Sequence, residues 1–252
     1  MGKIIAITGA GEGLGKALAK RLAADGDTVI LLGRTLSKLE AVLGEIGDGH
    51  MAAACDVGNP DSVRAAFAAV AERFPKIDVL INNAAIYQPF DLGEAADETI
   101  MAMTMTNFVG PIFVAREALP LLRGGGHLIN VSSESVHLRL AMLWLYEGTK
   151  AGLEMMSYMW GKELAAEGVK VSVVQAGAMM DPTNPKGPDW PGDTGMRFHM
   201  ANARQGNDMR QMPISTYKSV TDVFRAVIDM PADVHLNFVG VGGNPLPRQS
   251  NS

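Results

Sequence analysis

The strongest constraint on the fold lies near the start of the chain, where an apolar run, a glycine-rich turn, a helical pattern and a second apolar run follow one another over residues 4–34. This length suits one strand–helix–strand unit of a parallel sheet, which needs about 30 residues. The runs Ile4–Ile7 and Thr28–Leu32 are short and apolar, as in strands that are buried on both faces. Leucines recur every four residues between the two runs, which predicts a helix with one buried face.

The turn that precedes this helix has the spacing Thr8-Gly9-x-x-x-Gly13-x-Gly15. Glycines let backbone N–H groups approach an anion at the positive end of a helix, and the pyrophosphate of a dinucleotide is the expected anion. The spacing G-x-G-x-x-G does not fit, because Leu14 or Lys16 stands where its last glycine belongs. A glycine turn alone would also fit a plain loop. The turn residues predicted to bind the cofactor are Gly9, Gly11, Glu12, Gly13, Leu14 and Gly15.

The identity of the cofactor depends on residues about 20 positions beyond the turn, where an acidic side chain would hold the ribose 2′-hydroxyl of NAD. Gly33 and Arg34 stand there instead, followed by Thr35. A guanidinium group suits a 2′-phosphate, so we expect Arg34 and Thr35 to bind the cofactor and NADP(H) to be favoured over NAD(H). The alternative for Arg34 is a solvated strand end.

Strands and helices alternate over the rest of the chain. Further strands are predicted at 51–55, 79–81, 128–132, 169–174 and 236–241, and further helices at 36–46, 60–74, 97–122 and 143–167. This alternation predicts an α/β fold, a Rossmann-type doubly wound parallel sheet of about seven strands with helices on both faces. We expect one domain over residues 1–252, with the helix at 97–122 interrupted only mildly by Gly110–Pro111.

Residues 178–218 break the alternation, because they are rich in proline, glycine and methionine and include Trp190 and Phe198. A loop of this length in a compact domain is usually a lid, a binding loop or a disordered segment. The apolar content favours a lid that orders over a ligand, and disorder without ligand is compatible with that prediction.

Composition narrows the range of partners. A net charge of −5 and a pI of about 5.5 argue against nucleic acid and anionic membrane surfaces. Cys55 is the only cysteine, and the five histidines are scattered, so neither an intrachain disulfide nor a metal site is expected. No apolar run reaches about 18 residues and no signal-peptide pattern precedes the first strand, so the predicted location is cytoplasmic.

Polar residues follow several of the predicted strands, at the edge of a parallel sheet where ligands bind. An aspartate at the end of the third strand would accept a hydrogen bond from the adenine amino group, although an aspartate there can equally cap a helix. Asn83 follows the fourth strand, close to the cofactor's ribose, and Ser133 follows the fifth. The residues at these strand ends that we expect to bind the cofactor are Asp56, Val57, Asn83, Ala84 and Ala85.

Tyr146 and Lys150 lie four residues apart on a predicted helix and therefore share a face. The reference pKa of tyrosine is about 10, too high for proton transfer at neutral pH. A neighbouring ammonium, and the positive nicotinamide of an oxidised cofactor, would favour the phenolate and lower that pKa. The pair alone is weak evidence, since any long helix can carry it on a solvated face. The glycine turn and Ser133 in the same chain turn it into a predicted catalytic pair.

These motifs together resemble those of the short-chain dehydrogenase/reductase family over essentially the full chain. The residues that carry the resemblance are Thr8-Gly-Ala-Gly-Glu-Gly13-Leu-Gly15, Asp56-Val57, Asn82-Asn-Ala84, Asn107, Ser133 and Tyr146-Glu-Gly-Thr-Lys150, with the family's interval of 13 positions between Ser133 and Tyr146. The resemblance implies that Tyr146 is the general acid/base and that Lys150 lowers its pKa and binds the nicotinamide ribose. It also implies that Ser133 hydrogen-bonds the substrate oxygen and that Asn107 holds a water in the proton relay.

Several positions depart from the family pattern. Ala85 replaces the glycine that closes N-N-A-G, and Gln175-Ala176-Gly177 stands where N/P-P-G is usual. That second segment normally meets the nicotinamide carboxamide, so Gly177 and Met179 are the cofactor contacts expected there. Glu12 lies where NADP-preferring members often have a basic residue, which weakens the argument from Arg34 without reversing it.

The motifs and the resemblance predict an NADP(H)-dependent oxidoreductase that interconverts a secondary alcohol and a ketone on a small apolar substrate. Two alternatives stay open: a dinucleotide-binding sensor or scaffold without turnover, and an isomerase or dehydratase that uses the cofactor only transiently. The helices at 97–122 and 143–167 carry more apolar surface than one sheet face needs. Because the family pairs these helices across a two-fold axis, we expect a homodimer or homotetramer.

Overall fold

One parallel sheet organises the computed structural model, which describes residues 2–181, 188–231 and 233–244. Its seven strands lie in the order β3-β2-β1-β4-β5-β6-β9, so the chain runs outward in one direction from β1 and in the other from β4. The predicted doubly wound α/β fold is confirmed, and ligands of such sheets bind at the reversal between β1 and β4. The strands are β1 (Ile4–Thr8), β2 (Thr28–Gly33), β3 (Met51–Ala54), β4 (Val79–Asn82), β5 (His127–Ser133), β6 (Lys170–Ala176) and β9 (Phe238–Val241).

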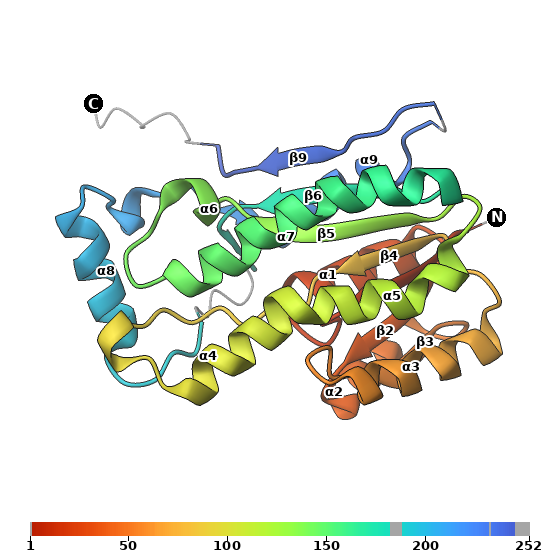
Figure 1. Ribbon diagram of the computed structural model, residues 1–252, viewed down its shortest axis with the longest axis horizontal. Helices are drawn as coiled ribbons and strands as arrows, with labels where there is room; N and C mark the ends of the chain where they lie inside the picture. The colour runs from red at the N-terminus through yellow and green to blue at the C-terminus, as the bar shows by residue number, and fades with distance from the viewer. Residues whose placement is uncertain (1, 182–187, 232, 245–252) are drawn as a thin grey trace.

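Helices cover both faces of the sheet. One face carries α1 (Gly13–Ala24), α2 (Leu36–Ile46) and α9 (Tyr217–Ile228). The other face, turned toward the viewer in Figure 1, carries α3 (Pro60–Arg73), α5 (Gly110–Leu122) and α7 (Trp144–Glu163). Shorter helical turns are η1 (Leu92–Glu94), α6 (Ser135–Leu138) and η3 (Leu164–Glu167). Within the described part of the chain, none of the helices is long and apolar enough to cross a membrane.

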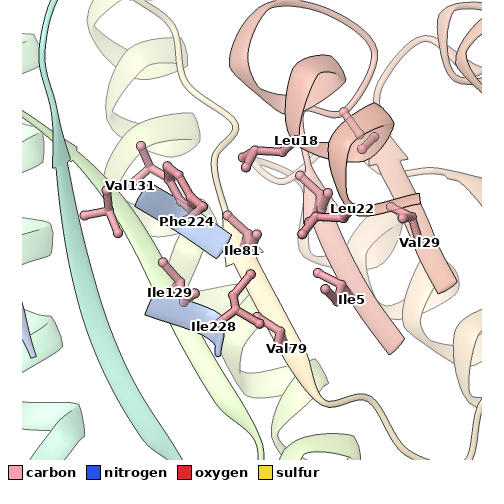
Figure 2. Close-up of a cluster of buried hydrophobic side chains, with 14 of the residues drawn as sticks. Ile5, Leu18, Leu22, Val29, Val79, Ile81, Ile129, Val131, Phe224 and Ile228 are labelled. Atoms are coloured by element: carbon pink, nitrogen blue, oxygen red, sulfur yellow. The ribbon is translucent and has the colours of Figure 1, made fainter. Parts of the chain in front are cut away.

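The apolar runs of the strands are explained by burial on both faces of the sheet. In β1, Ile5 and Ile7 belong to the core under α1 and α9, whereas Ala6 belongs to the core on the opposite face. Figure 2 shows the first of these cores, where Phe224 of α9 lies beside Val131 of β5. Phe224 is completely buried, so the sheet and α9 exclude water between them.

The long helix predicted at 97–122 is interrupted earlier than expected. α4 (Asp97–Thr104) continues into a π-helical turn, η2 (Met105–Val109), and α5 begins at Gly110, whose N–H donates to the carbonyl of Met105 five residues earlier. Pro111 explains the widening, because proline has no N–H to give to the carbonyl of Asn107 and its ring would clash with that carbonyl in an α-helix. The widened turn contains Asn107, whose side chain is completely buried.

The segment 178–218 is not the continuous loop that its composition predicts. It contains α8 (Thr194–Arg204), a 3₁₀ turn η4 (Met209–Gln211) and a parallel pair of short strands, β7 (Met179–Met180) and β8 (Ser215–Thr216). The prolines of the described part of this segment lie outside α8, so they limit the helix without breaking it. Phe198 of α8 is buried against Leu140 and Leu143. Residues 182–187 of the predicted lid lie outside the described residues.

Candidate active site

At Gly9 and Gly15, the turn between β1 and α1 leaves no room for a side chain. Gly9 has a φ of +67°, and a Cβ atom on it would lie 2.9 Å from the Cα of Ala84. A Cβ atom on Gly15 would lie 2.2 Å from the carbonyl oxygen of Gly9. α1 therefore begins as close to the turn as a backbone without side chains allows. Among the described residues, no side chain caps the N-terminus of α1, so its first N–H groups fit an anion such as the pyrophosphate of a dinucleotide.

Hydrogen bonds tie the end of β4 to this turn. The Thr8 hydroxyl accepts from the backbone N–H groups of Asn83 and Ala84, both at 3.0 Å. The Asn83 side chain donates from Nδ2 to the Thr8 carbonyl at 2.9 Å. Asn83 thus holds the two strand ends together at the point where the order of the sheet reverses.

A cavity of about 310 Å³ opens beside the turn. Its wall gathers the predicted cofactor residues of the turn and of the ends of β2, β3 and β4. These residues are Gly9, Gly11, Glu12, Gly13, Leu14, Arg34, Thr35, Asp56, Val57, Asn83, Ala84 and Ala85. Gly15 is not in the wall, since it is buried beneath the turn and contributes the close approach of α1.

The alternative reading of Asp56 as a helix cap is wrong, because Asn59 has that role. The Asn59 side chain accepts hydrogen bonds from the N–H groups of Asp61 and Ser62 in the first turn of α3. Asp56 instead accepts from the N–H of Gly58 at 3.0 Å through Oδ1 and lines the cavity. Its position beside Val57 suits an adenine ring.

The charged rim of this cavity contains a residue that the sequence analysis missed. Arg34 is exposed there and makes no side-chain hydrogen bond or ion pair with any other described residue. Lys38, in the first turn of α2, also lines the cavity, and its Nζ lies 2.6 Å from Glu12 Oε2. The signal for Lys38 was weak, because Arg34 precedes α2 and the helical interval of four residues does not apply to the pair.

A second cavity, of about 470 Å³, shares Leu14, Asn83 and Ala85 with the first. Its wall contains five further residues of the predicted site, from β5, α7 and the segment after β6. These are Ser133, Tyr146, Lys150, Gly177 and Met179. Apart from Gly15 and Asn107, the predicted site residues line one or both of these adjoining cavities, along which a dinucleotide could reach from the glycine turn to Tyr146.

Ser133 and Tyr146 lie together in the wall of this cavity, and the Oγ of Ser133 lies 2.9 Å from the Oγ of Ser135. Lys150 is 2% exposed, donates to the Val131 carbonyl at 2.7 Å, and lies with Nζ 5.7 Å from the centre of the Tyr146 ring. This arrangement places a phenol, a hydroxyl and an amine around one point of the cavity wall.

Burial controls the pKa values of this group. It raises the pKa of Tyr146 to about 12, although the nearby hydroxyl of Ser133 acts in the opposite direction. It lowers the pKa of Lys150 to about 8. The sequence predicted a lowered pKa for Tyr146, whereas the protein without cofactor raises it. The physical reason is that desolvation of the phenolate outweighs the effect of the Ser133 hydroxyl.

Asn107 lies apart from the wall of the second cavity. Its Oδ1 accepts from the N–H of Ile86 at 2.7 Å, and its Nδ2 donates to the carbonyl of Ile86 at 2.9 Å. Both ends of the amide therefore hold the chain that follows β4. A water at this residue would have to use its backbone carbonyl, which Pro111 leaves without the usual helical donor.

Aromatic side chains from distant segments cover Tyr146. The ring of Tyr87 makes an edge contact with Tyr146 at 5.0 Å between centroids, and Trp190 lies 5.4 Å from Tyr87. The indole N–H of Trp190 also donates to the carbonyl of Tyr87 at 2.9 Å. Sequence reasoning missed Tyr87, because no spacing links a residue after β4 with one near α8.

Comparison with known proteins agrees with this geometry. The family model described as short chain dehydrogenase matches residues 3–190. Carbonyl reductase family member 4 from Xenopus laevis is 32% identical over 70% of this chain and 75% of its own. An NADP-dependent 3-hydroxy acid dehydrogenase, YdfG, from Salmonella typhi is 28% identical over 94% of this chain and 93% of its own. The crystal structure of a short-chain dehydrogenase from Streptomyces avermitilis superposes with a TM-score of 0.84 at 26% identity, covering 96% of this chain and 89% of that one.

The chain therefore belongs to the short-chain dehydrogenase/reductase family, whose members named here are oxidoreductases. The resemblance drawn from its motifs is confirmed.

The close packing of Gly15 gives a testable prediction. Gly15→Ala places a Cβ atom 2.2 Å from the carbonyl oxygen of Gly9, so α1 or the turn must shift. We expect a loss of about 1–3 kcal/mol in the free energy of unfolding and at least about tenfold weaker NADPH binding. Urea unfolding and NADPH fluorescence titration measure the two effects. Gly44→Ala on α2 is the control, because a Cβ atom there meets nothing within 4 Å. Equal behaviour of the two variants would contradict the role given to Gly15.

Proposed function

We propose that this protein is an NADP(H)-dependent oxidoreductase that interconverts a secondary alcohol and a ketone, with Tyr146 as the general acid/base. One observation carries the proposal. Tyr146, with Ser133 in the same wall and the buried Lys150 beside its ring, lies where a cavity suited to a dinucleotide joins a second, largely apolar one. A sensor without turnover would have no use for this arrangement.

The roles of the residues follow from their positions. The nicotinamide, when bound, would supply or accept the hydride. Ser133 would donate a hydrogen bond to the substrate oxygen, and Tyr146 would transfer the proton to or from it. Because burial keeps the pKa of Tyr146 near 12, the phenol is protonated at neutral pH and suits proton donation to a ketone. Lys150 would bind the nicotinamide ribose and supply positive charge next to the phenol.

The preference for NADP(H) is supported by the rim of the first cavity. Arg34 faces the place of the adenine ribose without a partner among the described residues, and Lys38 of α2 lines the same cavity. Two cations there would bind a 2′-phosphate, although Glu12 would oppose it. The relative from Salmonella typhi, named as NADP-dependent, supports the same preference.

The substrate class follows from the lining of the second cavity. Tyr87, Trp190, Phe198, Met209 and Met212 contribute apolar surface around Tyr146. A small apolar carbonyl compound or the corresponding alcohol fits such a wall, because apolar surface predominates in it. The name of the relative from Xenopus laevis, a carbonyl reductase family member, agrees with this substrate class.

Two substitutions test the catalytic assignment. Tyr146→Phe removes one oxygen and keeps the ring contact with Tyr87, so NADPH should bind normally while kcat falls at least about 100-fold. Lys150→Met should lose activity and bind NADPH more weakly, because Lys150 has both roles. NADPH fluorescence gives the affinity, and NADPH consumption with a panel of aromatic and alicyclic ketones gives the rate.

Tyr158→Phe is the matched control, since Tyr158 lies on the same helix with an exposed side chain. A Tyr146→Phe enzyme that keeps most of its kcat would disprove the assignment, with His137 and Glu147 as the next candidates. A wild-type protein that binds NADPH without consuming it with any ketone would favour the sensor.

Arg34→Asp tests the cofactor assignment. The change replaces a cation by an anion at the proposed phosphate site, so the ratio of NADPH to NADH affinity should fall about tenfold or more. Affinities for the two cofactors are compared by fluorescence titration. Arg64→Asp on α3, also exposed but outside the cavity, is the control. An unchanged ratio in Arg34→Asp would remove the argument for NADP(H).

The assembly that we propose is a homodimer or homotetramer formed through α4 and α7. Met101 on α4 is 60% exposed, and Met155 and Met159 on α7 are each 63% exposed. Light scattering should give at least a dimer mass, and Met155→Asp with Met159→Asp should lower it, since charges are costly in an apolar interface. Met200→Asp on α8 is the control for an exposed methionine elsewhere. A monomeric wild-type mass would contradict the proposal.

A further inference from the structure

A carboxylate lies one helical turn beyond Lys150 and is held by two buried donors. Glu154 Oε1 accepts from the hydroxyl of Ser132 at 2.5 Å and from the side-chain amide of Gln175 at 3.0 Å. Ser132 and Gln175 are direct partners in the register of β5 and β6, and they are 2% and 6% exposed. Two adjacent strands therefore each supply a donor to one oxygen of Glu154, and we call this pair of donors, Ser132 and Gln175, the cradle.

The same stretch of β5 bonds both Glu154 and Lys150. Lys150 donates to the carbonyl of Val131, and the residue after Val131 is Ser132, which donates to Glu154. An ammonium that is almost completely buried and bonded to a neutral carbonyl is costly unless a counter-charge lies nearby.

We propose that Glu154 is a positioning residue for Lys150, whose carboxylate, held by Ser132 and Gln175, keeps the buried amine protonated for its work beside Tyr146. The inference rests on the role of Lys150 in the proposed function. It also gives a reason for Gln175, which departs from the family pattern at that position. A side-chain amide there donates to Glu154, which neither proline nor a shorter side chain at the same Cα would do in the same way.

Other charged groups near α7 do not replace Glu154. On α7 itself, Glu147 accepts from the N–H of Leu140. Glu134, after β5, accepts from the N–H of Ala178. Glu167 on η3 is paired with Arg123, and Lys162 and Glu163 are exposed at the far end of α7. The other charged or titratable groups on the packed elements lie at the opposite ends of β5 and β6 or are exposed on α4 and α6: His127, Lys170, Asp97, Glu98 and His137. Burial lowers the pKa of Lys150 to about 8, and Glu154 is the group that raises it.

The sign of the expected effect follows directly. Without the charge of Glu154, the pKa of Lys150 falls further, so the amine loses its proton at a lower pH. If activity requires the protonated amine, the alkaline limb of the kcat/KM profile moves to lower pH. A nearby charge shifts a pKa by about 1 unit or more, which sets the size of the displacement.

Glu154→Gln is the test, because glutamine keeps an oxygen that accepts from Ser132 and Gln175 and removes only the charge. We expect the alkaline limb to move down by about 1 pH unit. In cofactor-free protein, the ¹⁵Nζ resonance of Lys150, assigned by its loss in Lys150→Met, should titrate at a correspondingly lower pH. Glu163→Gln, the same change at the exposed end of α7, should leave both titrations unmoved.

Ser132→Ala gives an independent arm if Glu154→Gln does not fold. It removes the shorter hydrogen bond to Glu154 and leaves the charge, so both titrations should move in the same direction by less. A lower rate at every pH with no displacement of the limb or of the ¹⁵N titration would overturn the inference. A displaced ¹⁵N titration in a protein that reduces no ketone would uphold the inference and refute the proposed function.

Discussion

The close approach of α1 to the glycine turn is the constraint on which the rest of the site depends. A Cβ atom on Gly15 would meet the Gly9 carbonyl at 2.2 Å, so only glycine lets the helix begin so near the end of β1. Thr8 then holds the end of β4 against the same turn through the N–H groups of Asn83 and Ala84. β4 pairs in register with β5, which ends at Ser133. These contacts bring the turn, the end of β4 and the end of β5 together, and the two cavities therefore share Leu14, Asn83 and Ala85.

Burial then sets the protonation of Tyr146 and Lys150. It raises the pKa of Tyr146 and lowers that of Lys150, so each side chain is pushed toward its neutral form. The pair by itself therefore does not produce a phenolate. Positive charge has to be retained on Lys150 or added by an oxidised nicotinamide. Glu154 belongs to this balance although it does not line the cavity, because it raises the pKa of Lys150 from behind the wall.

Local patterns in the sequence predicted much of this arrangement, and long-range packing accounts for what they missed. The run Ile4–Ile7 predicts β1 because both faces of that strand are buried. Pro111 carried a usable signal for the π-helical turn at Asn107, since it cannot bond one turn back. By contrast, the contact of Glu154 with Ser132 and Gln175 spans more than 20 residues of sequence and depends on how α7 lies on two strands. No spacing rule predicts that register.

The same limit applies to the segment between Ser133 and Tyr146. Arg139 and Met142 have φ values of 55° and 66°, which residues with a Cβ atom seldom adopt unless the surroundings hold them. Asn202 of α8 supplies that hold, because its Oδ1 accepts from the N–H of Ala141 at 2.9 Å and its Nδ2 donates to the carbonyl of the same residue at 3.3 Å. Asn202 is completely buried. α8, which the composition of the segment did not predict, thus fixes the path of the chain into α7. It thereby fixes the position of Tyr146.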